Sequence, residues 1–320
     1  MMKYTVVIRT LGMAGEKFQR ELDSLCAQTL PPEDIIVYIA EGYPLPAETC
    51  GRERYVRVPK GMVAQRALPY DEVKTEWILF LDDDIYLPPV GVELLFNVLR
   101  ENEAQVVSPD TFYNSSRSLK SELLMTLSGR MLARRGDRKY GYRVMRTCGY
   151  SYNKSPEPRA YLSNTNAGNC FLCQKADFLK ICFEEERWLD TMSYPMGEDE
   201  VMFYKMHLIG LKQLTLFGSG IVHLDAGTTL QNVDRAKRMV EADYFFRKVF
   251  WTRFIQESEH NPFIRAWNRV CIGYFYIFGL AVSLVKGDRE MFRRKLKSID
   301  KARSFLKSPQ YASIPKVVRL

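Results

Sequence analysis

The chain has 320 residues, of which 46% are apolar and 26% are charged, enough apolar material for a sizeable core. The seven cysteines are scattered, which argues against a secreted disulfide framework and for free thiols in a reducing compartment. The first residues carry neither the apolar segment nor the cleavage site of a signal peptide, so we expect a cytoplasmic protein.

The positive charge is concentrated near the C-terminus. Residues 286–320 hold 11 Lys and Arg against 3 Asp and Glu, an excess that equals the net charge of +8 of the whole chain. Residues 1–285 are therefore neutral. This distribution favours an anionic surface as a partner and argues against nucleic acid bound in a groove through the fold.

The N-terminal part alternates between strand and helix patterns. Apolar β-branched runs at residues 4–8 and 35–39 flank a helical spacing over 16–28, which predicts a β-α-β unit and a parallel sheet. Further elements are predicted as strands at 55–58 and 106–107 and as helices over 61–74, interrupted or bent at Pro69, and over 88–100.

An uninterrupted apolar run over residues 77–81 stops at Asp82, Asp83 and Asp84. Such a run is typical of a central strand buried on both faces, and ligands bind at the carboxyl ends of parallel strands. Three adjacent carboxylates repel one another unless a cation compensates, and Mg²⁺ or Mn²⁺ commonly bridges carboxylates to phosphates. The triplet therefore predicts a metal–diphosphate site, with a solvated acidic turn as the alternative.

A second acidic cluster, Glu198-Asp199-Glu200, begins a predicted helix, where acidic residues are also favoured as caps. Together the two clusters could hold a metal and remove a proton, as transfer to a hydroxyl requires. His223 follows an apolar run, and we expect a metal ligand, a phosphate contact or a structural hydrogen bond there. The pair Cys170 and Cys173 fits two buried thiols better than half a zinc site.

The C-terminal part is predicted to be helical. A long helix over 233–254 precedes the uncharged residues 270–285, which fall short of the roughly 20 residues of a membrane span, and an amphipathic basic segment over 286–307. Two interpretations stay open: peripheral attachment to the anionic inner face of the cell membrane, or a helical hairpin packed on the enzyme. We expect a catalytic domain over 1–230 and a helical extension over 231–320.

Four segments in order resemble the family 2 glycosyltransferases, inverting enzymes of the GT-A fold. They are residues 6–10, residues 22–30 with the pattern L-x-S-L-x-x-Q-T, residues 80–84 with F-L-D-x-D, and residues 197–200 with G-E-D. The resemblance implies a GT-A-like, doubly wound, mostly parallel sheet flanked by helices, followed by the C-terminal helical extension.

The resemblance also implies roles for the acidic residues. Asp84 would bind Mn²⁺ or Mg²⁺, while Asp82 and Asp83 would border the donor. Asp199 would act as the general base, with Glu198 as the alternative. The implied contacts outside the acidic clusters are Thr10, Glu41 and Arg66 for the donor, and Asn166, Gly168 and Trp188 for the acceptor; Trp188 could equally belong to the core.

Inverting transfer from a nucleotide sugar, with UDP favoured, is the resulting hypothesis. The acceptor would be a saccharide, free or linked to polyprenyl diphosphate, in surface polysaccharide synthesis. The basic stretch 117–146 and the basic tail favour a phosphate-bearing acceptor at a membrane. Two alternatives remain: a sugar nucleotidyltransferase, which residues 11–17 echo faintly, and a non-catalytic membrane-associated scaffold.

Overall fold

The computed structural model describes residues 2–111, 118–224 and 233–317. Its strands are β1 (Tyr4–Thr10), β2 (Asp34–Ala40), β3 (Glu53–Val58), β4 (Trp77–Asp82), β5 (Ile85–Tyr86), β6 (Val106–Pro109), β7 (Met131–Arg134), β8 (Tyr142–Val144), β9 (Tyr150–Asn153), β10 (Ala160–Ser163), β11 (Cys170–Gln174), β12 (Gln213–Leu216) and β13 (Val222–His223). Its helices are α1 (Glu16–Cys26), α2 (Gly91–Glu101), α3 (Leu119–Leu127), α4 (Lys175–Leu179), α5 (Glu198–Leu208), α6 (Val233–Phe250), α7 (Pro262–Val285), α8 (Arg289–Leu306) and α9 (Pro309–Ala312), with a 3₁₀ segment η2 (Phe183–Thr191) and a π-helical segment η3 (Trp251–Gln256).

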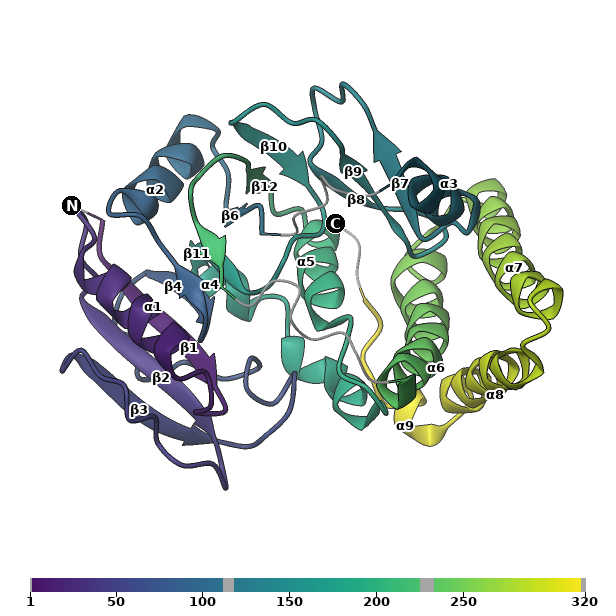
Figure 1. Cartoon of the computed structure of the whole chain (residues 1–320), viewed down its shortest axis with the longest axis horizontal. Coiled ribbons are helices and arrows are strands. Elements are labelled where there is room, and N and C mark those ends of the chain that lie inside the picture. Colours follow the sequence, from purple (N-terminus) through teal and green to yellow (C-terminus); the bar gives the residue numbers. More distant parts are fainter. Residues whose placement is uncertain (1, 112–117, 225–232, 318–320) are drawn as a thin grey trace.

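Eight strands form the main sheet, in the order β10-β12-β6-β11-β4-β1-β2-β3 (Figure 1). β1 is parallel to both β2 and β4, as the β-α-β pattern predicted, and β3 is parallel to β2. β11 runs antiparallel to both β4 and β6, so the sheet is mixed. The mixed order brings the start of β11 beside the end of β4, where the aspartate triplet follows.

Alternate residues of the central strands face two separate apolar cores. Val6 and Ile8 of β1 pack with α1 and α2 on one face of the sheet. Val7 points into the other core, which continues without a break through α5, α6, α7 and α8. This burial on both faces explains why residues 77–81 are continuously apolar. The predicted domain boundary after residue 230 lies outside the described residues, and that division stays a prediction.

The helix predicted over 61–74 is wrong. The segment makes a few turns that end before Pro69, and Tyr70 adopts a φ of 52°. Proline removes the backbone donor that a helix needs and disfavours helical backbone at the residue before it. Asp190 holds the first turn by accepting hydrogen bonds from Val63 N at 2.9 Å and Ala64 N at 3.2 Å.

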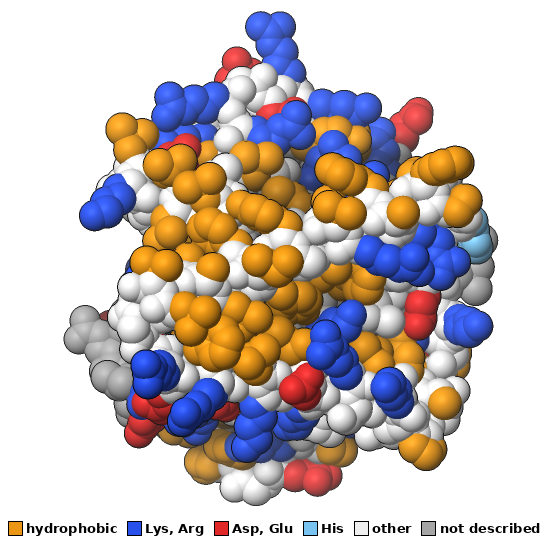
Figure 2. Space-filling view, turned by 90° about the vertical axis from the view of Figure 1, so that its right-hand side faces the viewer, with side chains coloured by type: hydrophobic (Ala, Val, Ile, Leu, Met, Phe, Trp, Pro, Cys, Tyr) orange, Lys and Arg blue, Asp and Glu red, His pale blue; other side chains and the backbone are white. Residues whose placement is uncertain are grey.

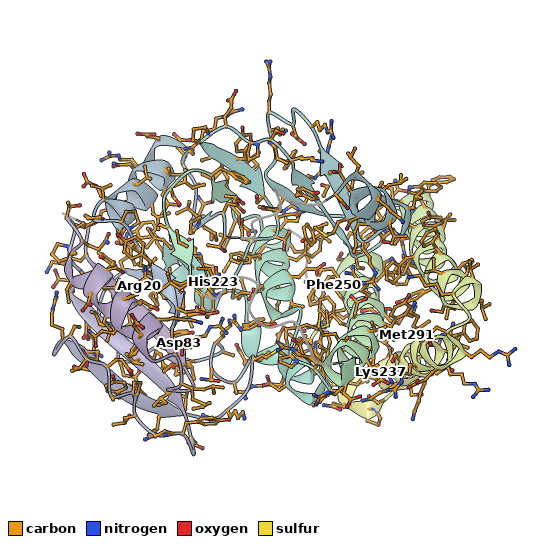
Figure 3. The ribbon with its side chains drawn as sticks, viewed as in Figure 1. Arg20, Asp83, His223, Lys237, Phe250 and Met291 are labelled. Atoms are coloured by element: carbon orange, nitrogen blue, oxygen red, sulfur yellow. The ribbon has the colours of Figure 1, made fainter. Side chains whose placement is uncertain are left out.

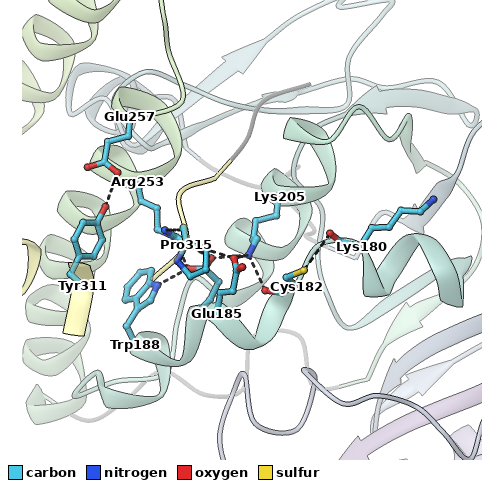
Figure 4. Close-up of polar contacts among 10 residues, drawn as sticks. Lys180, Cys182, Glu185, Trp188, Lys205, Arg253, Glu257, Tyr311 and Pro315 are labelled. Carbon is cyan, nitrogen blue, oxygen red and sulfur yellow. Dashed lines mark hydrogen bonds and ion pairs between the residues drawn. The ribbon is translucent and has the colours of Figure 1, made fainter. Parts of the chain in front are cut away.

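A buried ionic cluster ties η2, α5 and η3 together (Figure 4). The Glu186 carboxylate is fully buried and accepts hydrogen bonds from Lys205 at 2.9 Å, Arg253 at 2.8 Å and the indole N–H of Trp188 at 2.7 Å. Arg253 also donates to the carbonyl of Pro315 at 2.8 Å. The C-terminal segment is therefore fastened to the helix that carries the second acidic cluster.

Cys170 and Cys173 are both buried on β11, and burial raises the pKa of each thiol well above its usual range. The two side chains belong to different cores, Cys170 to the α1–α2 side and Cys173 to the opposite side. The two thiols therefore lie on opposite faces of one strand. This agrees with the prediction that they are two buried thiols.

Candidate active site

A cleft of about 470 Å³ opens at the carboxyl ends of β1 and β4. Figure 3 shows Asp83 and His223 in this part of the molecule, away from the C-terminal helices. Six of the predicted site residues line the cleft, namely Thr10, Asp82, Asp83, Asp84, Glu198 and His223. The structure therefore brings together residues that are up to 213 positions apart in the sequence.

The pairing of β1 with β4 fixes the first two aspartates. The register places Arg9 directly beside Asp82, and the two side chains form an ion pair. The Thr10 hydroxyl donates to Asp83 and accepts a hydrogen bond from the Gly12 backbone N–H at 2.7 Å. Each of these carboxylates thus has a partner on the neighbouring strand end.

Asp84 and His223 are brought together by a short second sheet. β13 pairs with β5 so that His223 stands opposite Ile85, and the Leu224 N–H donates to the Asp84 carbonyl at 2.8 Å. The His223 Nε2 atom lies 3.0 Å from Asp84 Oδ2, while the buried Asp84 Oδ1 has no hydrogen-bond partner. An unpartnered carboxylate oxygen beside an imidazole suits a divalent cation.

Over the residues that the structure describes, no three His, Cys, Asp or Glu side chains are arranged to hold a metal by themselves. Such a site would therefore draw further ligands from water and from a phosphate-bearing substrate, as Mg²⁺ sites commonly do.

Burial and mutual repulsion shift the acidity of the triplet. Burial, together with the Asp199 and Asp84 charges, raises the pKa of Asp82 to about 7 against the effect of Arg66. Burial and the neighbouring aspartates raise the pKa of Asp83 to about 6, although the Thr10 hydrogen bond opposes the shift. Raised pKa values mean that ionised carboxylates are costly here, and a cation in the cleft would offset that cost.

Glu198 of the second acidic cluster lines the cleft, whereas Asp199 does not, and Arg66 joins the two carboxylates. Its guanidinium donates to Glu198 Oε1 at 3.1 Å and to Asp199 Oδ1 at 3.0 Å. Burial and the Asp199 charge raise the pKa of Glu198, and Arg66 opposes them. A Cβ atom at Gly168 would lie only 2.1 Å from Asp199 Oδ1. The glycine therefore leaves the space in which the Asp199 carboxylate sits.

Several predicted binding residues lie elsewhere. Of the two roles left open for Trp188, the structure shows the core: the side chain is 1% exposed and packs against Phe246, so no acceptor sugar can reach the ring. Asn166 is also buried and accepts a hydrogen bond from Thr215. Glu41 is exposed beyond the end of β2 and does not line the cleft. Arg66 is turned toward carboxylates, and its predicted diphosphate contact stays a prediction.

Four residues at the site were not singled out from the sequence. Arg9, Lys17 and Gln65 line the cleft, and Gln65 donates to the Thr10 carbonyl at 3.2 Å. Glu21 lies buried behind the triplet and accepts from the Ile85 N–H at 3.0 Å; burial raises its pKa well above the usual range, and the three aspartates add to the shift. Arg9 could have been found, since neighbouring parallel strand ends meet at one edge.

Residues 4–151 match the model of the Glycosyl transferase family 64 domain. An alignment of 82 residues with the Exostosin-like-3 homolog of Caenorhabditis elegans shows 32% identity and covers 22% of this chain and 10% of that protein. The resemblance to family 2 is therefore wrong: short patterns such as F-L-D-x-D can suggest a family without deciding it. The inverting course of reaction rested on that resemblance and is withdrawn with it.

The fold matches a solved glycosyltransferase along most of the chain. The structure of GalNAc-T7 with UDP, GalNAc and Mn²⁺ superimposes with a TM-score of 0.50 at 13% identity, covering 90% of this chain and 58% of that one. The predicted GT-A-like fold with its C-terminal helical region is confirmed. The family 64 match over residues 4–151 is consistent with the prediction of a glycosyltransferase.

Proposed function

We propose that the protein transfers a sugar from a nucleoside-diphosphate sugar, with UDP as the favoured nucleotide, to a hydroxyl of a saccharide acceptor. The observation that carries the proposal is the convergence of Asp82 to Asp84 and Glu198 on one cleft at the strand ends, with Asp199 held beside Glu198 by Arg66. The family 64 match over residues 4–151 and the solved complex with UDP and Mn²⁺ support the donor class.

Asp84 and His223 would hold Mn²⁺ or Mg²⁺ in this proposal, since Asp84 offers a buried oxygen without a hydrogen-bond partner. A bound divalent cation would neutralise charge on the leaving diphosphate. Lys17 and Arg9 line the same cleft and add positive charge where the phosphates would lie. Thr10 and Asp82 border the donor from the ends of β1 and β4.

Transfer breaks the bond between the anomeric carbon and the diphosphate oxygen and forms a bond to the acceptor oxygen. The acceptor proton passes to Asp199, with Glu198 as the alternative base, and the nucleoside diphosphate leaves. Arg66 orients both carboxylates and favours their ionised forms. The anomeric configuration of the product, read by NMR, would show whether one displacement or two take place.

The acceptor is proposed to be a saccharide linked to a polyprenyl diphosphate, at the inner face of the cell membrane, in surface polysaccharide synthesis. The exposed Lys and Arg side chains of residues 134–143 and of α8 support a phosphate-bearing acceptor. A matched pair of acceptors, one with the lipid diphosphate and one without it, tests this part. Equal rates with the two acceptors would contradict it.

A thermal-shift screen tests which class of donor the protein binds. Incubation with UDP-, GDP- and dTDP-sugars in Mn²⁺ should raise the melting temperature for one nucleotide class, and excess EDTA should abolish the rise. A shift with nucleoside triphosphates plus a sugar phosphate, and none with nucleotide sugars, would instead indicate a nucleotidyltransferase. No shift with any of them would favour a non-catalytic scaffold.

A further inference from the structure

The outer face of α7 carries a continuous stripe of large apolar side chains. Its exposed members recur every three or four residues at Phe263, Trp267, Val270, Tyr274 and Ile277, and Leu284 follows seven residues later, two turns along the same face. Ile277 is 71% exposed and Val270 is 58% exposed. Such a stripe ordinarily marks the face of a helix that is buried against a partner.

Of the four buried side chains of α7, two are polar and two are apolar. The buried residues of the helix include Asn268 and Ser283, and the Lys295 ammonium donates to the Gly279 carbonyl at 2.7 Å and to Ser283 at 2.9 Å. A helix in water would place its polar residues outside and its apolar residues inside. On α7 large apolar side chains lie on both faces, and those of the outer face are exposed. An apolar medium on that side would cover them.

α3 extends the same surface. None of its residues is buried, and four of its leucines are exposed, namely Leu119, Leu123, Leu124 and Leu127. The Tyr274 hydroxyl of α7 donates to the Leu127 carbonyl, which joins the two helices side by side. Two helices far apart in the sequence therefore present one apolar area, and Figure 2 shows this area facing the viewer.

Exposed cations border this area. Arg265 and Arg269 lie near the start of α7, and Lys286, Arg289 and Arg293 follow its end. Figure 2 shows Lys and Arg side chains above and below the apolar band. Apolar area framed by cations complements a bilayer surface with anionic headgroups, and Trp267 and Tyr274 suit the boundary between headgroups and acyl chains.

We propose that α3 and α7 form one membrane-binding surface that lies in the plane of an anionic bilayer. α7 is long and apolar enough to cross a membrane, but Ile272 and Phe275 are buried in the core shared with α6 and α8. Only one face is thus available to lipid, so α7 lies along the bilayer instead of crossing it. The binding does not depend on the transfer reaction.

Flotation with lipid vesicles tests the surface. The whole protein should float with vesicles of equal parts phosphatidylglycerol and phosphatidylcholine, and less with phosphatidylcholine alone or at high salt. Val270→Gln/Ile277→Gln should lower the bound fraction about tenfold or more, since two lipid-facing side chains are lost. Leu123→Gln/Leu127→Gln on α3 should act in the same direction.

A matched control uses apolar residues that are exposed on other parts of the surface. Val90→Gln/Leu179→Gln should leave flotation unchanged, since Val90 is 53% exposed and Leu179 is 40% exposed on other elements. All variants should keep the melting temperature and circular dichroism of the parent. Retained flotation of the α7 variant would overturn the proposal, and an effect of α7 without α3 would overturn the joint surface.

Two further outcomes decide against the proposal. Equal binding to the two vesicle types would refute the role of anionic lipid. A wild-type dimer that fails to float, and that the α7 substitutions convert to a monomer in sedimentation, would show that a second copy of the chain covers this face.

Discussion

Two clusters of acidic and basic side chains differ in how their charges balance. In the cluster around Glu186, the carboxylates of Glu185 and Glu186 face Lys205 and Arg253. Burial alone would raise the pKa of Glu186, but the two cations outweigh it and hold the pKa below its usual range. The two negative charges of this cluster are balanced by two positive charges.

The cleft contains similar groups in unequal numbers. Arg9 forms an ion pair with Asp82, and Arg66 forms ion pairs with Glu198 and Asp199. With Lys17, which also lines the cleft, three cations face these three carboxylates and the neighbouring Asp83 and Asp84. Burial raises the pKa of Asp82 and Asp83, and Asp84 keeps a buried oxygen without a hydrogen-bond partner. Buried charges in the first cluster hold helices together, whereas the deficit of positive charge in the second leaves room for a cation and a substrate.

The largest expected effect is on the reaction. Asp84→Asn should lower the transfer rate by about 10³-fold or more, because it removes a proposed metal ligand worth several kcal/mol in the transition state. Mn²⁺ titration at fixed donor concentration measures the loss. Asp23→Asn on the exposed side of α1 is the control and should behave like the wild type. Unchanged turnover in Asp84→Asn would refute the metal site.

Breaking the balanced cluster should affect stability instead. Arg253→Met leaves the buried Glu186 with a single cation, which should lower the free energy of unfolding by about 3–5 kcal/mol. Urea denaturation measures the change. Arg303→Met removes an exposed pair with Asp300 and should change stability by less than about 0.5 kcal/mol. Similar losses in both variants would mean that burial of the pair is irrelevant.

Gly168→Ala tests the position of Asp199. The added methyl group would collide with Asp199 Oδ1, and a displacement of about 1 Å can cost roughly 10²-fold in rate. The loss should appear in kcat with little change in donor binding. Gly136→Ala provides a comparison with open space around it, although its φ of 67° adds strain. If Gly168→Ala kept full kcat, Asp199 would not be the base.

The pH dependence should have opposite signs in the two clusters. The raised pKa values of Asp82 and Asp83 give stability that is present below about pH 4 and is lost as the pH rises through 6 and 7. Glu186 contributes stability above its ordinary pKa, which is lost only as the pH falls through its lowered value.

In EDTA, the melting temperature of Asp82→Asn/Asp83→Asn should therefore rise relative to that of the wild type as the pH goes from 4 to 7. Mn²⁺ should reduce this gain, because the cation compensates the ionised carboxylates of the wild type. A constant difference at every pH would contradict the raised pKa values.

The main sheet and the site could be predicted where local pattern and topology agree. The apolar run before Asp82 and the β-α-β spacing placed the triplet at a strand end, and the cluster at Glu198 began a helix as expected. The turn around Arg66 could not be foreseen, because it is held by the side chain of Asp190, which lies 127 positions after Val63 in the sequence. His223 meets Asp84 only through β13 pairing with β5, and Trp188 is buried by helices that follow it in the chain.

The contact between Arg253 and the Pro315 carbonyl has a consequence for folding during synthesis. The core that contains α5 and Trp188 also receives Ile314 and Val317. An emerging chain can assemble the sheet early, but it cannot close this core until residue 317 has left the ribosome. The helix that begins with Glu198 and Asp199 therefore completes its packing later than the sheet does.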